Sequence, residues 1–354
     1  MTREQKAITT FPVPYHLGNS TDTTNSYNSN RMSKEEIIFH AFNFHSQGNI
    51  IEAEKYYKYF MNRGFSNPKV FSNYGMILLS LGNLNDAEKY VRNAISLSPD
   101  FAEAYSNLGN ILLELGNLKE AEESTRKAIK LMPDLAIAYS NLGNILLGLG
   151  DIKEAEKKTR ESIRLDPDLA LAHATLGSIL FEIGKLKDAE ISTLKAITIN
   201  SNNADLFCNL GSIQIGLNKL SEAKISTYKA IELKSDFADA YYNLGSISRD
   251  LGELSECEKS LFKAIEINPN FVKPYFVLSS LDSINFNLIK KKLFSKSFLD
   301  KRSIKEKIDI YFARSNILHG IKEYKESGEN LLLANNLKSK INQSSINNII
   351  RKSK

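Results

Sequence analysis

Cysteine is scarce in this sequence, and so are long hydrophobic runs. The 354 residues contain two cysteines, Cys208 and Cys257, far apart and without a CxxC spacing. This excludes a disulfide framework and argues against a structural zinc site. No apolar run approaches the length of about 18 residues that suggests a membrane span, and the first residues lack the apolar core of a signal peptide. We therefore expect a cytoplasmic protein with no membrane partner.

A glycine-rich phosphate-binding loop is also missing. Such a loop presents consecutive backbone N–H groups at a helix start, typically after a strand. The glycines in 147–151 and 114–118 lie instead at the internal turns of a repeat. His40 and His45 are five residues apart, which is not the i, i+4 spacing of a zinc pair. No nucleophile, base and orienting group form an interpretable arrangement, so we expect no enzyme activity, catalytic residue, metal or cofactor.

The formal net charge of +5 conceals a difference between the two ends of the chain. From residue 272 onward there are 17 Lys and Arg against 7 Asp and Glu, whereas residues 1–271 contain 29 against 34. A basic region can bind nucleic acid or an acidic surface, or it can be an ordinary solvated lysine-rich helix. No aromatic stacking platform is interleaved with these charges, which favours the solvated helix and no nucleic-acid partner.

A repeat of 34 residues occupies most of the chain. Starting at Pro68, six units span 68–101, 102–135, 136–169, 170–203, 204–237 and 238–271, and a looser unit spans 34–67. Each unit contains two stretches of helical apolar spacing, separated at mid-unit by a glycine or asparagine and a short turn. Neighbouring helix pairs must stack to bury their apolar faces, so the pattern predicts an all-α solenoid.

Four positions of the repeat have physical explanations. Position 8 is glycine in all six units, although glycine inside a helix costs about 1 kcal/mol relative to alanine. Close approach of the paired helix offsets this, because its facing position 20 is also small. Position 27, where the second helix is expected to meet the next repeat, is alanine except at Ser162, and proline at position 32 ends that helix in four units. The members are Gly75, Gly109, Gly143, Gly177, Gly211 and Gly245 at position 8, and Ala87, Ala121, Ala155, Ala189, Ala223 and Cys257 at position 20.

This pattern resembles the tetratricopeptide repeat (TPR). The resemblance implies a right-handed superhelix of antiparallel helix pairs, in which the first helix of each pair lines a concave groove. It covers seven repeats, residues 34–271.

The flanking segments differ from the repeat. Residues 1–33 form a polar Ser/Thr/Asn-rich tail that we expect to be disordered, and Ser33 with Glu36 predicts a capping box at the first helix. Residues 272–307 are expected to be a degenerate helical repeat. Residues 308–341 are expected to form a final capping helix pair with Ser315, Ser327 and Ala334 at positions 8, 20 and 27, and 342–354 a basic tail.

A second resemblance concerns the C-terminal region. The segment YFARSNILHGIKEYKESGENLLLANNLK is similar to the last helix pair before the catalytic domain of bacterial TPR-sulfotransferase proteins. In that family a strand and a phosphate-binding Gly-x-Pro-Arg-Ser-Gly loop follow, whereas this sequence ends at Lys354 without them. The resemblance therefore implies an alternative function, the substrate-recruiting arm of a transferase whose catalytic domain is missing from this chain.

A ladder of asparagines marks position 6 of the first helices. Its members are Asn73, Asn107, Asn141, Thr175, Asn209 and Asn243. A carboxamide offers one acceptor and two donors, which match a peptide backbone without regard to side chains. The ladder resembles the one in the TPR arm of O-linked N-acetylglucosamine transferases, which implies that it faces the groove and binds an extended peptide. For the transferase alternative, this resemblance adds a glycosyltransferase as a second, less favoured choice after a sulfotransferase. Alternatively, these asparagines are groove residues hydrogen-bonded to water or to a neighbouring helix.

Other groove positions refine the expected partner. Position 9 adds Asn110 and Asn144 to the predicted peptide-binding residues. Charges at positions 2 and 13 make the groove mildly acidic, which predicts a protein or peptide partner with an extended, neutral or basic segment. The lysines and arginines with which TPR domains clamp the C-terminal carboxylate of chaperones are absent. The sequence thus favours a non-catalytic binding scaffold, and a scaffold that uses its convex face or basic tail is a further alternative. The charged residues are Lys69, Glu103, Glu114, Glu182, Asp205, Asp239 and Asp250.

Overall fold

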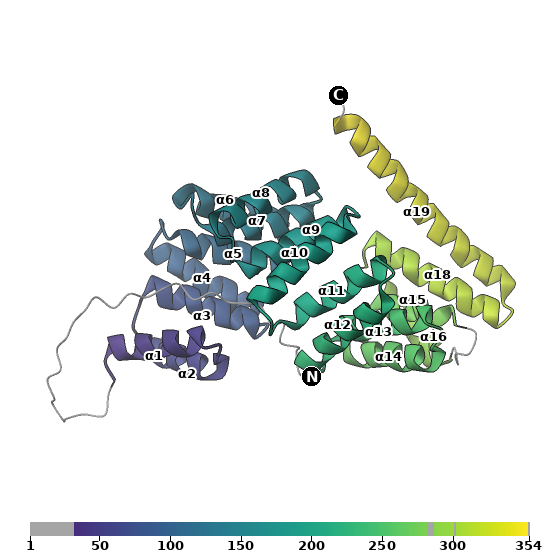
Figure 1. Ribbon diagram of the computed structural model, residues 1–354, viewed down its shortest axis with the longest axis horizontal. Coiled ribbons are helices and arrows are strands. Elements are labelled where there is room, and N and C mark those ends of the chain that lie inside the picture. The colour runs from purple at the N-terminus through teal and green to yellow at the C-terminus, as the bar shows by residue number, and fades with distance from the viewer. Residues whose placement is uncertain (1–31, 282–286, 301, 353–354) are drawn as a thin grey trace. The chain divides into compact units, whose positions relative to one another are not determined.

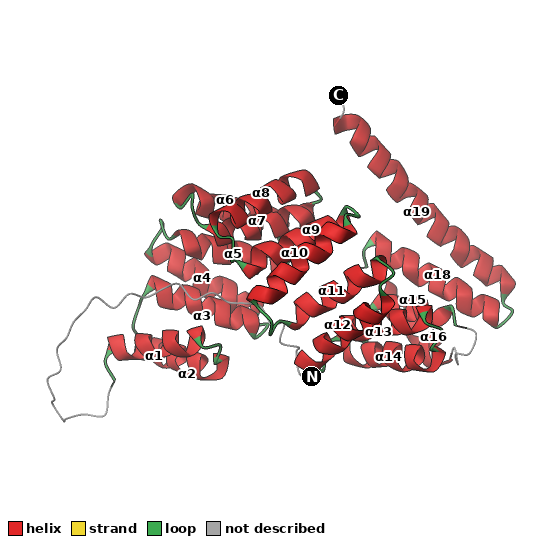
Figure 2. Cartoon of the chain, viewed as in Figure 1, coloured by secondary structure: helices red, strands yellow, loops and turns green. Residues whose placement is uncertain are grey.

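Helices are the only regular secondary structure in the part of the chain that the computed structural model describes, residues 32–281, 287–300 and 302–352 (Figure 2). The predicted all-α solenoid of tandem repeats is confirmed (Figure 1). Contacts divide the chain into two compact units, Met1–Asn203 and Ala204–Lys354. The disordered tail expected for 1–33 lies outside the described residues except for its last two positions.

The described part of unit 1, residues 32–203, contains five helix pairs, each made of two consecutive helices that pack against each other. They are α1 (Lys34–Ser46) with α2 (Ile50–Asn62), α3 (Pro68–Ser80) with α4 (Leu84–Leu97), α5 (Ala102–Glu114) with α6 (Leu118–Leu131), α7 (Ala136–Leu149) with α8 (Ile152–Leu165), and α9 (Ala170–Glu182) with α10 (Leu186–Ile199).

Unit 2 begins with two regular pairs and ends with less regular helices. They are α11 (Ala204–Gly216), α12 (Leu220–Leu233), α13 (Ala238–Asp250), α14 (Leu254–Ile267), α15 (Val272–Ser279), α16 (Asn287–Leu293), α17 (Lys296–Leu299), α18 (Ile304–Gly320) and α19 (Tyr324–Lys352). Helix α18 begins four residues before the expected start of the final pair at 308, and α19 continues through the segment expected to be a basic tail.

The position-8 glycines allow the two helices of a pair to approach closely. A Cβ atom added to Gly109 would overlap Thr125 Oγ1 and would lie 3.2 Å from the carbonyl oxygen of Ala121. The expectation that position 20 faces the glycine is therefore correct for its backbone, but the tightest side-chain contact comes from position 24. Thr125 Oγ1 is itself held in place, because it donates a hydrogen bond to the Ala121 carbonyl at 2.8 Å.

The turn inside each repeat requires a left-handed residue after the first helix. Glycine supplies it in most repeats, as at Gly116, where φ is 80°. In the fifth unit Asn218 takes the same place with φ 58°. Asparagine tolerates this conformation better than most other residues with a Cβ atom. In the final helix pair Lys322 occupies the same position with φ 67°.

Ser162, the exception among the position-27 alanines, has a specific partner. Its hydroxyl donates a 2.7 Å hydrogen bond to the Ala136 carbonyl at the start of α7, in the same repeat. Position 27 thus contacts the first helix of its own repeat here, whereas the sequence predicted a contact with the next repeat. The serine is accommodated in the core because its polar group is satisfied.

The first helix pair caps the N-terminal end of the array. The predicted capping box is present: Ser33 Oγ accepts from Glu36 N at 3.2 Å, and the Glu36 carboxylate accepts from Ser33 N at 2.7 Å. Positions 7 and 10, which are Tyr74 and Ile77 in the next repeat and buried there, are His40 and Asn43 in α1, where neither is fully buried. Such a polar outer face is typical of terminal repeats.

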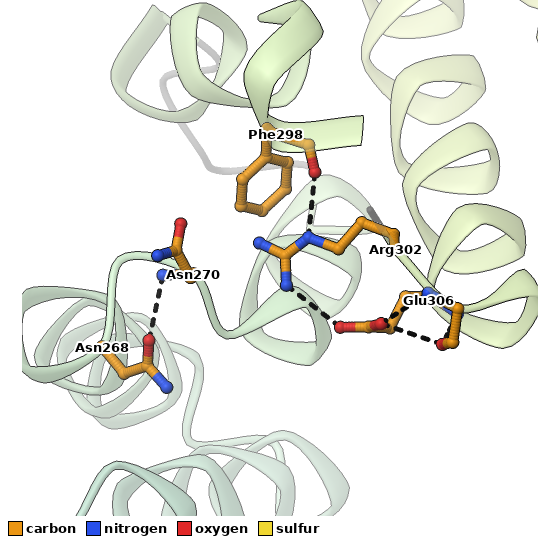
Figure 3. A network of polar contacts seen from close by, with 6 residues as sticks. Asn268, Asn270, Phe298, Arg302 and Glu306 are labelled. Carbon is orange, nitrogen blue, oxygen red and sulfur yellow. Dashed lines mark hydrogen bonds and ion pairs between the residues drawn. The ribbon is translucent and has the colours of Figure 1, made fainter. Parts of the chain in front are cut away.

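The C-terminal region of unit 2 is held together by side chains from its irregular segment. Arg302 donates to the Phe298 carbonyl at 3.0 Å and to Glu306 at 3.1 Å, and its guanidinium lies 4.8 Å from the Phe298 ring centre (Figure 3). Phe298 is buried and packs edge-on against Tyr275 of α15. These contacts fix the start of α18 on α15.

The final helix pair reproduces the close approach of the repeat with serines in place of glycine and alanine. Ser315 Oγ donates to the Ser327 carbonyl at 3.0 Å, and Ser327 Oγ donates to the Ser315 carbonyl at 2.9 Å. Ala334 is fully buried. The predicted equivalence of these three residues with positions 8, 20 and 27 agrees with this packing.

Candidate functional site

The predicted ladder residues lie on the first helices of successive repeats. Unit 1 holds Asn73, Asn107, Asn141 and Thr175, on α3, α5, α7 and α9, and unit 2 holds Asn209 and Asn243, on α11 and α13. Position 9 places Asn110 and Asn144 three residues after the ladder, almost one helical turn further along α5 and α7.

The amide nitrogens of the ladder bridge consecutive repeats. Asn141 Nδ2 donates to the Ser106 hydroxyl at 3.1 Å and approaches the Ser106 carbonyl at 3.4 Å. Asn107 Nδ2 donates to the Ser72 hydroxyl at 3.0 Å. In each case position 6 of one repeat reaches position 5 of the preceding repeat. The interpretation in which the ladder hydrogen-bonds a neighbouring helix is therefore correct for these donors.

The same arrangement recurs in unit 2. Asn243 Nδ2 donates to the Cys208 carbonyl at 3.1 Å and to the Ser212 hydroxyl at 2.9 Å. A backbone carbonyl can only accept, so its partner must be the NH2 side of the amide, and this fixes the orientation of the carboxamide. The carbonyl partners of Asn141 and Asn243 thus determine which way each side chain points.

The amide oxygens of these asparagines remain available. In the part of the chain that the structure describes, no protein donor meets Oδ1 of Asn107, Asn141 or Asn243. None of these oxygens is among the fully buried polar atoms that lack a partner. Each carboxamide thus uses its donors within the fold. Asn107 is half-buried, whereas Asn141 and Asn243 are only 5% and 6% exposed, so their acceptors reach the surface over a small area.

Asn73 differs from the other ladder residues. It was expected on the groove, but it is completely buried. Its side chain hydrogen-bonds with Tyr57 of α2, itself a buried core residue. Asn73 therefore belongs to the core between the first two repeats, where its partner is the hydroxyl group of Tyr57 and not a ligand in a groove.

Asn209 differs in the opposite sense. It is exposed, and within the described residues its side chain makes no hydrogen bond to protein. Asn110 and Asn144 are half-buried, and within the described residues their side chains make no hydrogen bond to protein. By contrast, the serine at position 9 in the fifth unit, Ser212, donates to the carbonyl of its own helix at 3.2 Å. The three asparagines therefore keep both donors and acceptor free.

The charges near the ladder are mixed in unit 2. Burial is the main cause that raises the pKa of the Cys208 thiol, and the carboxylates of Asp239 and Asp205 raise it further, so the thiol stays protonated. Lys273 of α15 lies 5.6 Å from the centre of the Tyr242 ring. Sequence reasoning missed Lys273, although it follows the array by two residues and occupies position 2 of the degenerate unit.

Residues 32–281, 287–300 and 302–352 contain no group of three or more His, Cys, Asp and Glu placed to bind a metal ion. None of the helices in these ranges is both long enough and apolar enough to span a bilayer.

Family models match the central part of the chain. Models described as tetratricopeptide repeat match residues 68–101, 100–168, 140–205, 204–237 and 238–271, and together they cover 68–271. A comparison with curated proteins found no match.

Solved structures with a similar fold were also found. The Cut9–Hcn1 hetero-tetramer of the APC/C is similar with 16% identity and a TM-score of 0.56, over 68% of this chain and 45% of that chain. A TPR protein of Thermus thermophilus has 21% identity and a TM-score of 0.48, over 51% of this chain and 98% of its own. A TPR protein of Parabacteroides merdae has 18% identity and a TM-score of 0.49, over 73% and 96% of the two chains. At these identities the likeness concerns the fold alone.

Proposed function

The chain belongs to the tetratricopeptide repeat proteins, whose fold is a scaffold for protein–protein contacts, and from this premise we propose that the ladder asparagines of each unit bind an extended segment of a partner protein. In unit 1 the backbone N–H groups of the bound segment donate to Oδ1 of Asn107 and Asn141, and in unit 2 those of a bound segment donate to Oδ1 of Asn243. The exposed amide of Asn209 and the half-buried amides of Asn110 and Asn144 add contacts that can both donate and accept.

The observation that carries the proposal is that the ladder carboxamides bond within the fold through their NH2 groups but not through their oxygens. The NH2 group of Asn141 is held by Ser106 of the preceding repeat, while its Oδ1 has no protein donor among the described residues. A side chain fixed in this way loses little conformational entropy when a ligand binds, so its acceptor is preorganised. Because an amide oxygen accepts from any backbone N–H group, such binding would tolerate many partner sequences.

The charges near the ladder suggest the character of the partner. Asp205 and Asp239 in unit 2, and Glu103 in unit 1, occupy position 2 and outnumber Lys69 and Lys273 at the same position. Lys273 lies over the Tyr242 ring, so part of its charge already has a partner. We therefore propose a neutral or basic segment, bound without catalysis and without a cofactor.

Replacing the ladder residues tests the proposal. The variant in which Asn107, Asn141 and Asn243 are all changed to alanine is compared with the native chain for binding to a panel of fluorescent, extended ten-residue peptides of neutral composition. We expect binding to weaken by about tenfold or more, since each lost hydrogen bond is worth about 0.5–1.5 kcal/mol.

A matched control separates groove binding from other surfaces. Asn93 lies on the second helix α4, is exposed, and is changed to alanine in the control variant, which should bind like the native chain. Circular dichroism of each variant shows whether it is folded. Unchanged peptide binding by a folded triple variant would place the binding site elsewhere, for example on the convex face.

A further inference from the structure

The outer faces of the second helices change in character along the chain. At position 25, Arg126 on α6 donates to Glu154 of the next repeat at 2.9 Å, and Arg92 on α4 pairs with Glu120 in the same way. Arg160 on α8 instead pairs with Glu156 of its own helix at 2.8 Å. At position 25, inter-repeat ion pairs are thus made by Arg92 and Arg126, both in unit 1. In unit 2 the inter-repeat pairs come from Lys224, at position 21 of α12, which pairs with Glu253 at 2.7 Å and Glu256 at 3.0 Å.

In the later repeats this arginine is replaced by apolar residues. Position 25 becomes Leu194, Tyr228 and Phe262. Position 22, three residues earlier, becomes Ile225 on α12, which is 71% exposed. Exposed aliphatic side chains grouped with aromatic ones are typical of interaction surfaces, whereas single ones are common everywhere.

A cavity of about 710 Å³ opens at this place in unit 2, between α12, α13 and α14. Tyr228, Ile231, Tyr241, Leu244 and Phe262 provide its apolar lining. This volume lies in the range of pockets that bind ligands. The equivalent cavity between α8, α9 and α10 of unit 1, which Arg160 lines, has about 330 Å³.

Some charged side chains at the rim of the larger cavity form ion pairs, and one does not. Lys263 pairs with Glu266 at 3.0 Å. Glu256 accepts from Tyr228 at 2.7 Å and from Lys224 at 3.0 Å. Lys259 has no carboxylate partner among the described residues, so the rim offers one unneutralised cation to whatever enters the cavity.

Helix α19 carries a feature of matching chemistry. Its buried residues, such as Ser327 and Ala334, face α18. Leu332 and Leu333, which form the leucine ridge, point away from that side and are 63% and 46% exposed. Glu329 lies three residues before Leu332, hence on the same side of the helix, and it has no cationic partner among the described residues. The outer face of α19 thus combines a leucine ridge with a free carboxylate.

The ridge and the cavity belong to the same unit, but they are formed by helices that do not pack directly on each other. Helix α14 packs on α15, α15 on α18, and α18 on α19 (Figure 1). Two helices therefore separate the ridge from the cavity wall, and the ridge cannot fill the cavity of its own chain.

We propose that the leucine ridge of α19 docks into the α12–α14 cavity of a second copy of this chain. Leu332 enters the space lined by Tyr228 and Phe262, and Glu329 of one copy meets Lys259 of the other. If each copy gives its ridge and receives the other's, the dimer is closed by a twofold axis and its two interfaces are identical. This surface is separate from the ladder asparagines, so the proposal is independent of the proposed peptide binding.

Sedimentation velocity of the full chain as a function of concentration tests the proposal. We expect a monomer–dimer equilibrium in the native chain. Lys259→Glu and Glu329→Lys alone should each weaken it by about tenfold or more, because like charges then meet, and the double variant should restore it. Lys157→Glu is the matched control, since Lys157 is exposed and occupies position 22 of an earlier repeat.

A cross-link then identifies the contact. A mixture of Lys259→Cys and Glu329→Cys chains should form a disulfide-linked heterodimer, whereas Lys157→Cys mixed with Glu329→Cys should not. A native chain that stays monomeric throughout the micromolar range would overturn the proposal. So would a dimer that neither charge reversal weakens, because the ridge and cavity would then not form its interface.

Discussion

Asn141 donates from its side-chain amide to Ser106 of the preceding repeat, reaching both the hydroxyl at 3.1 Å and the carbonyl at 3.4 Å. The contact joins two consecutive repeats through one polar side chain. It also turns the amide oxygen away from the fold. One residue thereby serves both the stacking of repeats and the presentation of an acceptor.

Asn141→Ala should destabilise the protein by about 1–2 kcal/mol, because the hydrogen bond to a nearly buried partner is lost. Urea unfolding measures the change. Asn209→Ala is the control, since Asn209 is exposed, and its effect should stay within about 0.5 kcal/mol. Equal losses in the two variants would mean that the Asn141–Ser106 contact contributes little to stacking.

Gly109→Ala should destabilise the protein by about 1–3 kcal/mol, because the new methyl group overlaps Thr125 Oγ1. Adding Thr125→Ala should recover part of that loss by removing the overlapping atom.

Gly148→Ala is the matched control for this prediction. A Cβ atom at Gly148 would meet its nearest neighbour, Leu118 Cδ2, at 3.4 Å, which allows it to fit, and alanine is the better helix former. This variant should be neutral or more stable in thermal unfolding. If Gly109→Ala were equally well tolerated, close helix approach would not explain the invariant glycine.

Acid should destabilise the first helix pair through His45. Burial lowers the pKa of His45 to about 4, and its ring lies 3.0 Å from the Tyr57 hydroxyl. The unfolded chain, with a His pKa of about 6.5, then binds more protons than the folded one between pH 6.5 and pH 4, so stability falls as the pH is lowered through that window. From pH 7 to pH 5 the loss should be about 2 kcal/mol.

Unfolding of the native chain and of His45→Asn at both pH values checks this expectation. The variant should be less stable at pH 7 and should lack this part of the pH dependence. The same pH dependence in both proteins would assign it to other groups.

The charge of the peptide should affect binding to the ladder surface. A lysine-substituted peptide should bind more tightly than its glutamate-substituted twin, because carboxylates such as Asp205 and Asp239 flank the ladder. The difference should shrink as salt is added, since these charges are largely solvated. Fluorescence anisotropy at two ionic strengths measures both effects, and tighter binding of the acidic peptide would contradict the expected partner chemistry.

The periodicity predicted the fold because close packing makes strict demands. Only glycine fits between a first helix and the side chain at position 24, as at Gly109, so the period is visible at that column. Where the paired helices can approach with residues other than glycine, the sequence indicated the packing less clearly. The pairing of Ser315 with Ser327 fulfils the same role with other residues, and only the helix phase reveals it.

The candidate site was less predictable than the fold. The column of asparagines was evident, but which side of each amide is free depends on its neighbour in the preceding repeat. A serine or a backbone carbonyl at position 5 engages the NH2 group of Asn141, whereas Tyr57 retains Asn73 in the core. Such differences depend on the tertiary contacts of single residues, which the repeat pattern does not reveal.

The central claim is that ladder oxygens accept from the backbone N–H groups of an extended partner, and peptide backbone methylation tests it most directly. Two neutral peptides of identical side chains are compared, one of them N-methylated at alternate residues so that these donors are lost. The account predicts that methylation weakens binding to the native chain by about tenfold or more, and that it has much less effect on the variant with alanine at 107, 141 and 243. Equal binding of both peptides to the native chain would contradict it.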